Sequence, residues 1–308
     1  MKKTITIRVP ATSANCGPAF DCMGVACTLY DDFTYTVSDT KSGFYLQVIG
    51  EGAGMLHPSG RNLAFSSFLE IWNQYTNHMR VGITLQMRND IPMSRGLGSS
   101  SAAIVGGVMA ANILAEAHLN REQILKVANK IEGHPDNVAP AIYGGFTISC
   151  LKDGEPHCLR FLPSKPLQFI AVIPDKPLAT ALARKALPAQ VSLQDAVFNE
   201  SRSALLAGSL MSGQYEFLPL AMEDKLHQPY RARLIPGMEN VFQAGQAAGA
   251  YHCIISGAGS TIMAYADEKH DGTAIGKAMV DAFAACGQKA VAKILLMDQD
   301  GAKILEEK

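Results

Sequence analysis

The sequence predicts an α+β fold of two domains, and three observations lead to this prediction. The chain has 308 residues, more than a single hydrophobic core usually organises. Hydrophobic residues make up 48% and charged residues 18%, so the chain has enough apolar side chains for packed cores and lacks the composition of a disordered protein. Segments with the strand period and the helix period are mixed without the regular alternation of a doubly wound sheet.

Residues 1–155 form the expected N-terminal domain. Its first segment, residues 4–9, alternates polar and apolar side chains as a half-buried strand does, and the apolar side chains of residues 63–72 recur with the helix period. By the same criteria, strands are expected at residues 4–9, 25–29, 33–37, 44–49, 81–87 and 146–150. Helices are expected at residues 63–76, 100–118, 121–132 and 136–143.

Residues 156–308 form the expected C-terminal domain. The turn-rich stretch at residues 152–166, which contains Pro163 and Pro166, marks the boundary region before it. Strands are expected after it at residues 167–173, 251–255, 261–266 and 290–297. Helices are expected at residues 178–186, 192–211, 237–248 and 273–286.

The overall charge excludes an extended anion-binding surface. Lys and Arg number 27 and Asp and Glu 28, so the net charge is -1 and neither nucleic acid nor an anionic membrane is an expected partner. The seven cysteines are odd in number and contain no C-x-x-C pair, which indicates reduced thiols in a cytoplasmic protein. Residues 96–115 carry no charge, but they are rich in Gly, Ser and Ala, which favours a buried helix over a membrane span.

The most informative segment is the loop at residues 92–102, between a predicted strand and a predicted helix. Gly96 and Gly98 permit backbone conformations closed to other residues and let a ligand approach the main chain. Ser99, Ser100 and Ser101 follow where the helix begins, and a helix start offers unpaired N–H groups and a partial positive charge. The loop, which is called the phosphate loop below, therefore predicts an anion site, although a glycine turn with a serine N-cap explains the same residues.

Two familiar phosphate motifs are absent from the sequence. No G-x-x-x-x-G-K-[ST] loop occurs, and Ser101 takes the place of the third glycine of a dinucleotide fingerprint. A P-loop NTPase and an NAD-dependent dehydrogenase are therefore disfavoured. The anion site at residues 92–102 needs another context to identify its ligand.

Two further segments supply that context, residues 10–21 and residues 255–261. With the loop, they resemble the three motifs of the GHMP small-molecule kinases, in the order and at the positions found in that family. The first motif, together with residues 132–140 and 224–231, is similar specifically to the homoserine kinase branch. The resemblance extends from Arg8 to Met297.

This resemblance implies the two-domain fold of the family. It combines an N-terminal ribosomal-S5-like β-α-β domain with a C-terminal ferredoxin-like α/β-plait domain. Three positions depart from the usual pattern: Cys16 stands where the family has Leu, Ala19 where it has Gly, and Ser260 where it has Pro. The resemblance also implies a homodimer.

The resemblance implies that ATP and Mg²⁺ bind at the loop. Asn62 matches an adenine contact, although a helix N-cap explains it equally well. The magnesium pair is Ser99, or its neighbour Ser100, with Glu132, whose alternative explanation is a solvated carboxylate at a helix end. The implied nucleotide-binding residues are Asn62, Pro92, Met93, Ser94, Arg95, Gly96, Leu97, Gly98, Ser99, Ser100, Ser101 and Ala102.

Homoserine, the implied substrate, is a zwitterion with a terminal hydroxyl. Arg184 and Arg231 match family residues that bind its carboxylate, a task suited to the planar guanidinium fork. Asn15, Asp21 and Asp136 match the side that receives its ammonium group. The implied substrate-binding residues are Asn15, Asp21, Asp136, Asn137, Thr180, Arg184 and Arg231.

The implied catalytic residues are Asn137, Arg231 and Ser99. Phosphoryl transfer depends mainly on positioning and charge stabilisation. Several relatives carry Asp near the attacking hydroxyl where Asn137 stands, and an amide cannot accept a proton. We therefore expect no dedicated base, with His134 as the alternative. The turn at residues 256–260 is expected to support the phosphate loop, although a simple hairpin turn explains the same glycines.

The implied reaction is ATP-dependent phosphorylation of L-homoserine in threonine biosynthesis. One alternative is another GHMP kinase of the mevalonate type, whose substrate has no ammonium group for Asp21 and Asp136 to bind. A second alternative is a non-catalytic ligand sensor on the same fold. Such a sensor is expected to lack the metal pair, yet Ser99 and Glu132 are both present.

Overall fold

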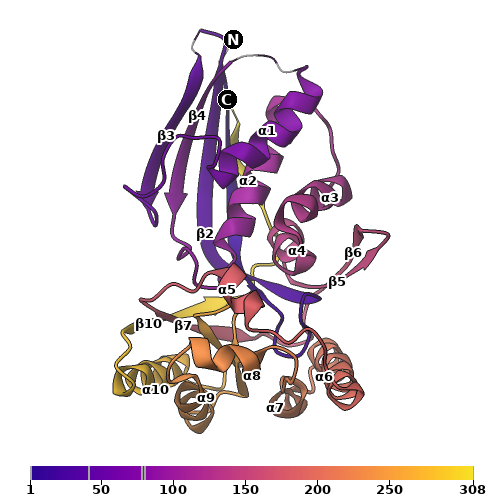
Figure 1. Ribbon diagram of the computed structural model, residues 1–308, viewed down its shortest axis with the longest axis vertical. Coiled ribbons are helices and arrows are strands. Elements are labelled where there is room, and N and C mark those ends of the chain that lie inside the picture. The colour runs from indigo at the N-terminus through magenta and orange to yellow at the C-terminus, as the bar shows by residue number, and fades with distance from the viewer. Residues whose placement is uncertain (1, 41, 78, 80, 308) are drawn as a thin grey trace.

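The computed structural model describes residues 2–40, 42–77, 79 and 81–307, and two β-sheets organise them (Figure 1). The first sheet has the order β11-β1-β2-β4-β3, and β5 and β6 extend it from β2. Its strands are β1 (Lys2–Ala14), β2 (Met23–Ser38), β3 (Gly43–Gly50), β4 (Gly82–Asn89), β5 (Phe146–Lys152), β6 (Glu155–Phe161) and β11 (Lys303–Glu307).

Four helices cover one face of the first sheet (Figure 1). They are α1 (Leu63–Tyr75), α2 (Ser99–Leu114), α3 (Arg121–Glu132) and α4 (Pro135–Tyr143). The central helix α2 approaches its neighbours closely because small residues line it. A Cβ on Gly106 would lie 2.5 Å from the Phe33 ring, and one on Gly107 would lie 2.3 Å from the Ala64 carbonyl oxygen. The uncharged segment is thus a buried helix.

The second sheet has the order β10-β7-β9-β8. Its strands are β7 (Gln168–Pro174), β8 (His252–Ile255), β9 (Ile262–Ala266) and β10 (Ala290–Leu296). The helices α9 (Met238–Ala247) and α10 (Gly272–Ala285) pack on one face of it. The remaining helices are α5 (Thr180–Lys185), α6 (Leu193–Ser212), α7 (Leu218–Ala221) and α8 (Gln228–Arg231), with short 3-10 turns at Tyr215–Phe217 and Ala232–Leu234.

Strand β7 is apolar after Gln168 because it faces two hydrophobic cores. Successive side chains of a strand point to opposite faces. Phe169 and Ala171 belong to the larger core, whereas Ile170 and Val172 belong to the core beneath α9 and α10. Phe169 also meets Phe146 of the first sheet with ring centroids 6.1 Å apart. The strands β7, β8 and β9 are therefore buried between the second sheet's own helices and the N-terminal half, whereas the edge strand β10 is largely exposed.

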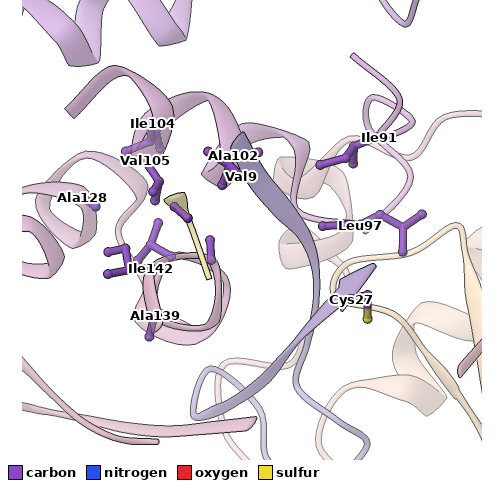
Figure 2. Packing of buried hydrophobic residues seen from close by; sticks show 14 of the residues in the cluster. Val9, Cys27, Ile91, Leu97, Ala102, Ile104, Val105, Ala128, Ala139 and Ile142 are labelled. Carbon is purple, nitrogen blue, oxygen red and sulfur yellow. The ribbon is translucent and has the colours of Figure 1, made fainter. Parts of the chain in front are cut away.

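The larger core fills the space between the first sheet and its helices. Figure 2 shows part of it, where Ala102 and Val105 of α2 lie near Val9 of β1 and Ile142 of α4. All four side chains are at most 1% exposed. This core carries the start of α2, and hence the phosphate loop before it, on a rigid support. Among the described residues, no helix is both long and apolar enough to cross a membrane.

Most predicted elements appear in the structure, with three differences. The strands expected at residues 25–29 and 33–37 are one strand, β2, which bends past β1 where the register shifts between Pro10 and Ala11. The strands β6 and β11 and the helices α7 and α8 were not expected, because each is short or lies among prolines and charged residues.

The first sheet continues past the boundary expected between residues 155 and 156. Strand β6 begins at Glu155 and pairs with β5, and β11 pairs with β1 from the other end of the chain. Pro156 and the neighbouring turn residues conceal the strand pattern of β6 in the sequence. The division into residues 1–155 and 156–308 stays a prediction.

A buried carboxylate closes the end of β4 where the phosphate loop begins. Asp31 of β2 is 1% exposed, and its Oδ1 accepts hydrogen bonds from the backbone N–H of Asp90 at 2.8 Å and of Ile91 at 2.9 Å. Burial raises the pKa of Asp31 to about 7, against the opposing effect of these two donors. The sequence offered no signal for this residue beyond a charge inside an apolar strand.

Asp31→Asn should make the protein more stable than the wild type at alkaline pH. An acid whose pKa is raised by folding contributes stability below its unfolded pKa, and this contribution is lost as the pH rises through the folded value near 7. Asparagine keeps the Oδ1 acceptor and carries no charge. Denaturant unfolding from about pH 4 to about pH 8 should show the variant gaining on the order of 2 kcal/mol relative to the wild type.

Asp32→Asn is the matched control, because the neighbouring Asp32 pairs with Arg8 on the other face of β2. This variant should show no such gain with rising pH. If the difference in free energy of unfolding between Asp31→Asn and the wild type did not change with pH, this result would contradict the assignment of a buried carboxyl that is neutral at low pH.

Candidate active site

A cavity of about 240 Å³ lies where the phosphate loop meets segments from both halves of the chain. It is lined by most of the residues that the sequence singled out: Asn15, Asp21, Asn62, Pro92, Met93, Ser94, Arg95, Gly96, Leu97, Gly98, Ser99, Ser100, Glu132, Asp136, Asn137, Thr180, Arg184 and Arg231. Ser101 and Ala102 are fully buried behind this lining. Residues distant in sequence are thus brought together around one space.

The phosphate loop approaches two other segments of the chain so closely that its glycines could carry no side chain. Gly96 has a φ of +76°, and a Cβ there would lie 2.1 Å from the carbonyl oxygen of Ser256. Gly98 has a φ of +75°, and a Cβ there would lie 2.0 Å from Oγ1 of Thr12. Both positions therefore require glycine for space as well as for backbone conformation.

Gly98 is also the N-cap residue of α2, and no side chain caps the first turn of this helix. The N–H groups at the helix start therefore remain available to a ligand beside the cavity. Together with the partial positive charge of the helix N-terminus, they suit a phosphate group. This geometry agrees with the anion site expected from the glycines and serines.

The turn at residues 256–260 holds the phosphate loop, as expected. The Ser256 hydroxyl donates to the Gly96 carbonyl at 2.6 Å, and the Thr261 N–H donates to the Arg95 carbonyl at 3.1 Å. The first motif joins both, because the Thr12 N–H donates to the Leu97 carbonyl at 3.1 Å and the Gly257 N–H donates to the Ala14 carbonyl at 3.2 Å. The prediction of a supporting turn is confirmed.

The Arg95 side chain acts as a tie to the second sheet. Its guanidinium donates to the carbonyls of Met93 at 2.6 Å, Pro174 at 3.1 Å and Asp175 at 2.5 Å. The Arg95 guanidinium, which was expected to contact the nucleotide, thus donates to three backbone carbonyls at the end of β7 and in the loop. Arg95 anchors the loop to β7, while the rest of the loop faces the cavity.

Three hard oxygen atoms that suit Mg²⁺ lie at the start of α2 and the end of α3. Oε1 of Glu132 accepts hydrogen bonds from the hydroxyls of Ser100 at 2.8 Å and Ser101 at 2.9 Å. Carboxylate and hydroxyl oxygens beside a phosphate site are the donors that Mg²⁺ takes in proteins. Of the two serines considered for the metal pair, Ser100 is the one that bonds to Glu132, whereas Ser99 lines the cavity beside it.

Asn62 is the N-cap of α1, one of the two explanations considered for it, and the adenine contact stays a prediction. Its side chain accepts a hydrogen bond from the Phe65 N–H at 3.1 Å. It also lines the cavity, as do Leu63 and Asp31. The capping bond orients the Asn62 amide at this end of the cavity.

The two charged residues expected to bind opposite ends of the substrate bind each other here. Arg184 of α5 donates to both carboxylate oxygens of Asp21, at 2.7 Å and 3.0 Å. Asn15 holds Asp21 in place, because its Oδ1 accepts from the Asp21 N–H at 3.0 Å and its Nδ2 donates to the Gly257 carbonyl at 2.9 Å. The ion pair of Arg184 and Asp21 therefore places a positive and a negative group next to each other in the cavity wall.

Asp21, His134 and Asp136 lie together at one corner of the cavity. Their ligand atoms all lie within 4.8 Å of one another. Asp136 is 1% exposed, and its Oδ1 lies 2.6 Å from Nδ1 of His134. Burial lowers the pKa of His134, but the hydrogen bond and charge of Asp136 raise it overall. Two carboxylates at this corner, that of Asp136 buried and that of Asp21 half-buried, would suit an ammonium group.

Arg231 reaches the cavity from α8 although it is only 2% exposed. Its Nη1 donates to the Gly257 carbonyl at 3.0 Å and lies 3.2 Å from Nδ1 of His227. His227 Nε2 lies 2.7 Å from the Gly17 carbonyl, so Nε2 carries the proton and Nδ1 accepts from Arg231. Burial lowers the pKa of His227, and burial together with Arg184 lowers that of Arg231 to about 10.

Asp224 builds the turn that presents Arg231. Its carboxylate accepts hydrogen bonds from the backbone N–H groups of Leu226 at 2.9 Å, His227 at 3.0 Å and Gln228 at 2.6 Å. The spacing of Asp, His and Arg in residues 224–231 is therefore explained by a chain of contacts that ends at Arg231. The individual roles of Asp224 and His227 could not be read from that spacing alone.

Gly96→Ala should weaken ATP binding, because the added Cβ would overlap the Ser256 carbonyl and displace the loop. We expect ATP affinity to fall by at least about tenfold, together with a lower melting temperature. Gly154→Ala is the matched control, since Gly154 has a φ of +82° but no neighbour within 4 Å of its added Cβ. Titration calorimetry with ATP checks both variants. Equal ATP affinities in the two would contradict the close approach at Gly96.

Comparison with known proteins identifies the family of this chain. A family model described as the GHMP kinases N terminal domain matches residues 62–145, and one described as GHMP kinases C terminal matches residues 200–285. The homoserine kinase of Desulfitobacterium hafniense is 41% identical over 303 residues, which is 98% of this chain and 100% of that protein. That of Trichormus variabilis is 41% identical over 299 residues, 97% of this chain and 98% of that protein.

A solved structure extends the likeness to three dimensions. The crystal structure of homoserine kinase from Cytophaga hutchinsonii superimposes with a TM-score of 0.88 at 29% identity, over 98% of this chain and 97% of that chain. The two-domain GHMP fold expected from the motifs is confirmed. The chain belongs to the homoserine kinases of the GHMP kinase family.

Proposed function

We propose that this chain transfers the γ-phosphoryl group of ATP to the side-chain hydroxyl of L-homoserine, producing O-phospho-L-homoserine for threonine biosynthesis. The observation that carries the proposal is the composition of a single cavity. An anion-binding loop lines one part of it, and two arginines and two aspartates line another. A phosphate donor and a small zwitterion are the ligands that match these two parts.

The nucleotide phosphates would lie against the N–H groups of the loop and the start of α2. Mg²⁺ would be held by Ser100 and Glu132, and when bound it neutralises phosphate charge. Ser101 would hold the Glu132 carboxylate from behind, since it bonds to the same oxygen from a fully buried position. Asn62 would contact the adenine at the far end of the cavity.

Homoserine would bind with its charged groups against the cavity wall. Arg184 and Arg231 would take its carboxylate, and Asp21 and Asp136 its ammonium group. Arg184 and Asp21 satisfy each other in the described structure. The substrate would share this ion pair, adding an opposite charge to each partner, so neither group would lose its compensation on binding.

Asn137 would lie beside the reacting hydroxyl. An amide side chain can orient this hydroxyl or donate to an oxygen of the transferring phosphoryl group, but it cannot remove a proton. We therefore propose that the hydroxyl proton leaves late, to phosphate or to water. His134 stays the alternative base, because its bond to Asp136 uses Nδ1 and leaves Nε2 as the nitrogen that could accept a proton.

A mevalonate-type kinase and a non-catalytic sensor fit the cavity less well. Mevalonate has a carboxylate but no ammonium group, so it would offer no cation to the two carboxylates of Asp21 and Asp136. A sensor has no need of a carboxylate bonded to hydroxyls beside the phosphate loop, and Glu132 is in that position. We also propose a homodimer in the cytoplasm, a location that the seven free cysteines favour.

A coupled assay of ADP release should show turnover with ATP and L-homoserine and background rates with mevalonate. Asp136→Asn should raise the KM for homoserine by at least about tenfold and leave the KM for ATP within about threefold, because the carboxylate faces the ammonium group and not the nucleotide. Lys277→Met, which breaks only an exposed ion pair with Asp281, is the control and should change neither. Preference for mevalonate, or no turnover with any hydroxylated amino acid, would contradict the proposal.

Asn137→Asp should not accelerate the reaction. If the hydroxyl needs no dedicated base, a carboxylate at this position adds negative charge near the phosphoryl group and lowers kcat. The pH profile of kcat should also gain no new ionisation in the range of a carboxyl group. A faster variant whose profile acquires such an ionisation would show that a base at residue 137 assists the reaction.

A further inference from the structure

A buried threonine connects the phosphate loop to Asn137. Thr12 of β1 is fully buried, and its hydroxyl donates to Oδ1 of Asn137 at 2.8 Å across 125 residues of sequence. Its backbone N–H donates to the Leu97 carbonyl at 3.1 Å. The same side chain leaves no room for a Cβ on Gly98. One residue thus touches both the loop expected to hold phosphate and the amide expected to meet the hydroxyl.

The position of the Thr12 side chain is rigidly determined. The residue lies within β1, where it pairs with Ala26 of β2. Its β-branched side chain has few allowed rotamers, and the loop backbone at Gly98 packs directly against Oγ1. The hydroxyl therefore meets Asn137 from a fixed direction.

We propose that Thr12 is a positioning residue that sets the orientation of the Asn137 amide. Because the hydroxyl donates to Oδ1, the carbonyl end of the amide faces the sheet and the NH₂ end faces away from Thr12. Asn137 also lines the cavity, so this orientation offers hydrogen-bond donors to a ligand there. This inference rests on the role proposed for Asn137 beside the reacting hydroxyl.

The orientation of the Asn137 amide matters for the chemistry of the transfer. An amide held in this orientation donates to oxygen atoms that become more negative during phosphoryl transfer, which is a contact that strengthens in the transition state. Without the Thr12 hydroxyl, the amide could rotate and present its carbonyl oxygen to the same atoms. Removal of the Thr12 hydroxyl should therefore lower kcat and leave substrate binding nearly unchanged.

Thr12→Val tests this, because valine has nearly the shape of threonine and lacks the hydroxyl. We expect kcat to fall by at least about tenfold while the KM values for ATP and homoserine change by less than about threefold. Thr12→Ser, which keeps the hydroxyl, should recover most of kcat. Thr147→Val is the matched control, because Thr147 is an equally buried threonine of the same sheet that does not line the cavity.

A double-mutant cycle separates a positioning role from a structural one. In the Asn137→Ala background, Thr12→Val should lower kcat no further, since there is no amide left to orient. A full additional loss in that background, or an unchanged kcat in Thr12→Val alone, would overturn the inference about Thr12 and leave the proposed reaction intact. An unchanged kcat in Asn137→Ala would overturn the role of Asn137 and this inference with it.

Melting temperatures of all variants accompany the kinetics. If Thr12→Val does not fold, Thr12→Ala removes the same hydroxyl without adding a methyl group, and the same split between kcat and KM is expected. A fall in melting temperature with a proportional loss of active protein, and no change in kcat per folded enzyme, would also overturn the inference.

Discussion

The site depends on the direct approach of three backbone segments from distant parts of the chain. Gly96 lies so close to Ser256, and Gly98 so close to Thr12, that no side chain fits between them. Hydrogen bonds from Ser256 to Gly96 and from Thr12 to Leu97 hold these contacts. Because β1, α2 and β9 carry the three segments on packed cores, the phosphate loop has a defined shape before any ligand binds.

Local charges build this site in a protein with almost no net charge. Arg184 and Arg231 bring positive groups to the cavity, while Asp21 and Asp136 bring negative ones. Arg184 is held by a partner of opposite charge, Asp21, whereas Arg231 is held by neutral groups, among them His227. A low dielectric strengthens these interactions, and it also makes an unpaired charge costly, so the cavity suits a ligand that carries both charges.

Motifs in the sequence identified most of the residues that line the cavity, but they did not reveal how residues distant in sequence contact one another. Glycine spacing and the serines at the start of α2 were enough to single out the loop that lines the cavity. Other contacts depend on where side chains meet in space and could not be predicted. Arg184 binds Asp21, Ser100 rather than Ser99 donates to Glu132, and Arg95 donates to backbone carbonyls. In the fold, long alternating segments such as β1 were predictable, but β6 and β11 depend on partners from the rest of the sheet.

The most direct measurement is a crystal structure with a non-hydrolysable ATP analogue, Mg²⁺ and L-homoserine bound together. The account predicts the γ-phosphate against the N–H groups of the loop and α2, with the metal between Ser100 and Glu132. It also predicts the homoserine hydroxyl next to the γ-phosphate and the NH₂ group of Asn137. Phosphates bound away from Gly96 and Gly98, or homoserine with its ammonium group away from Asp21 and Asp136, would contradict it.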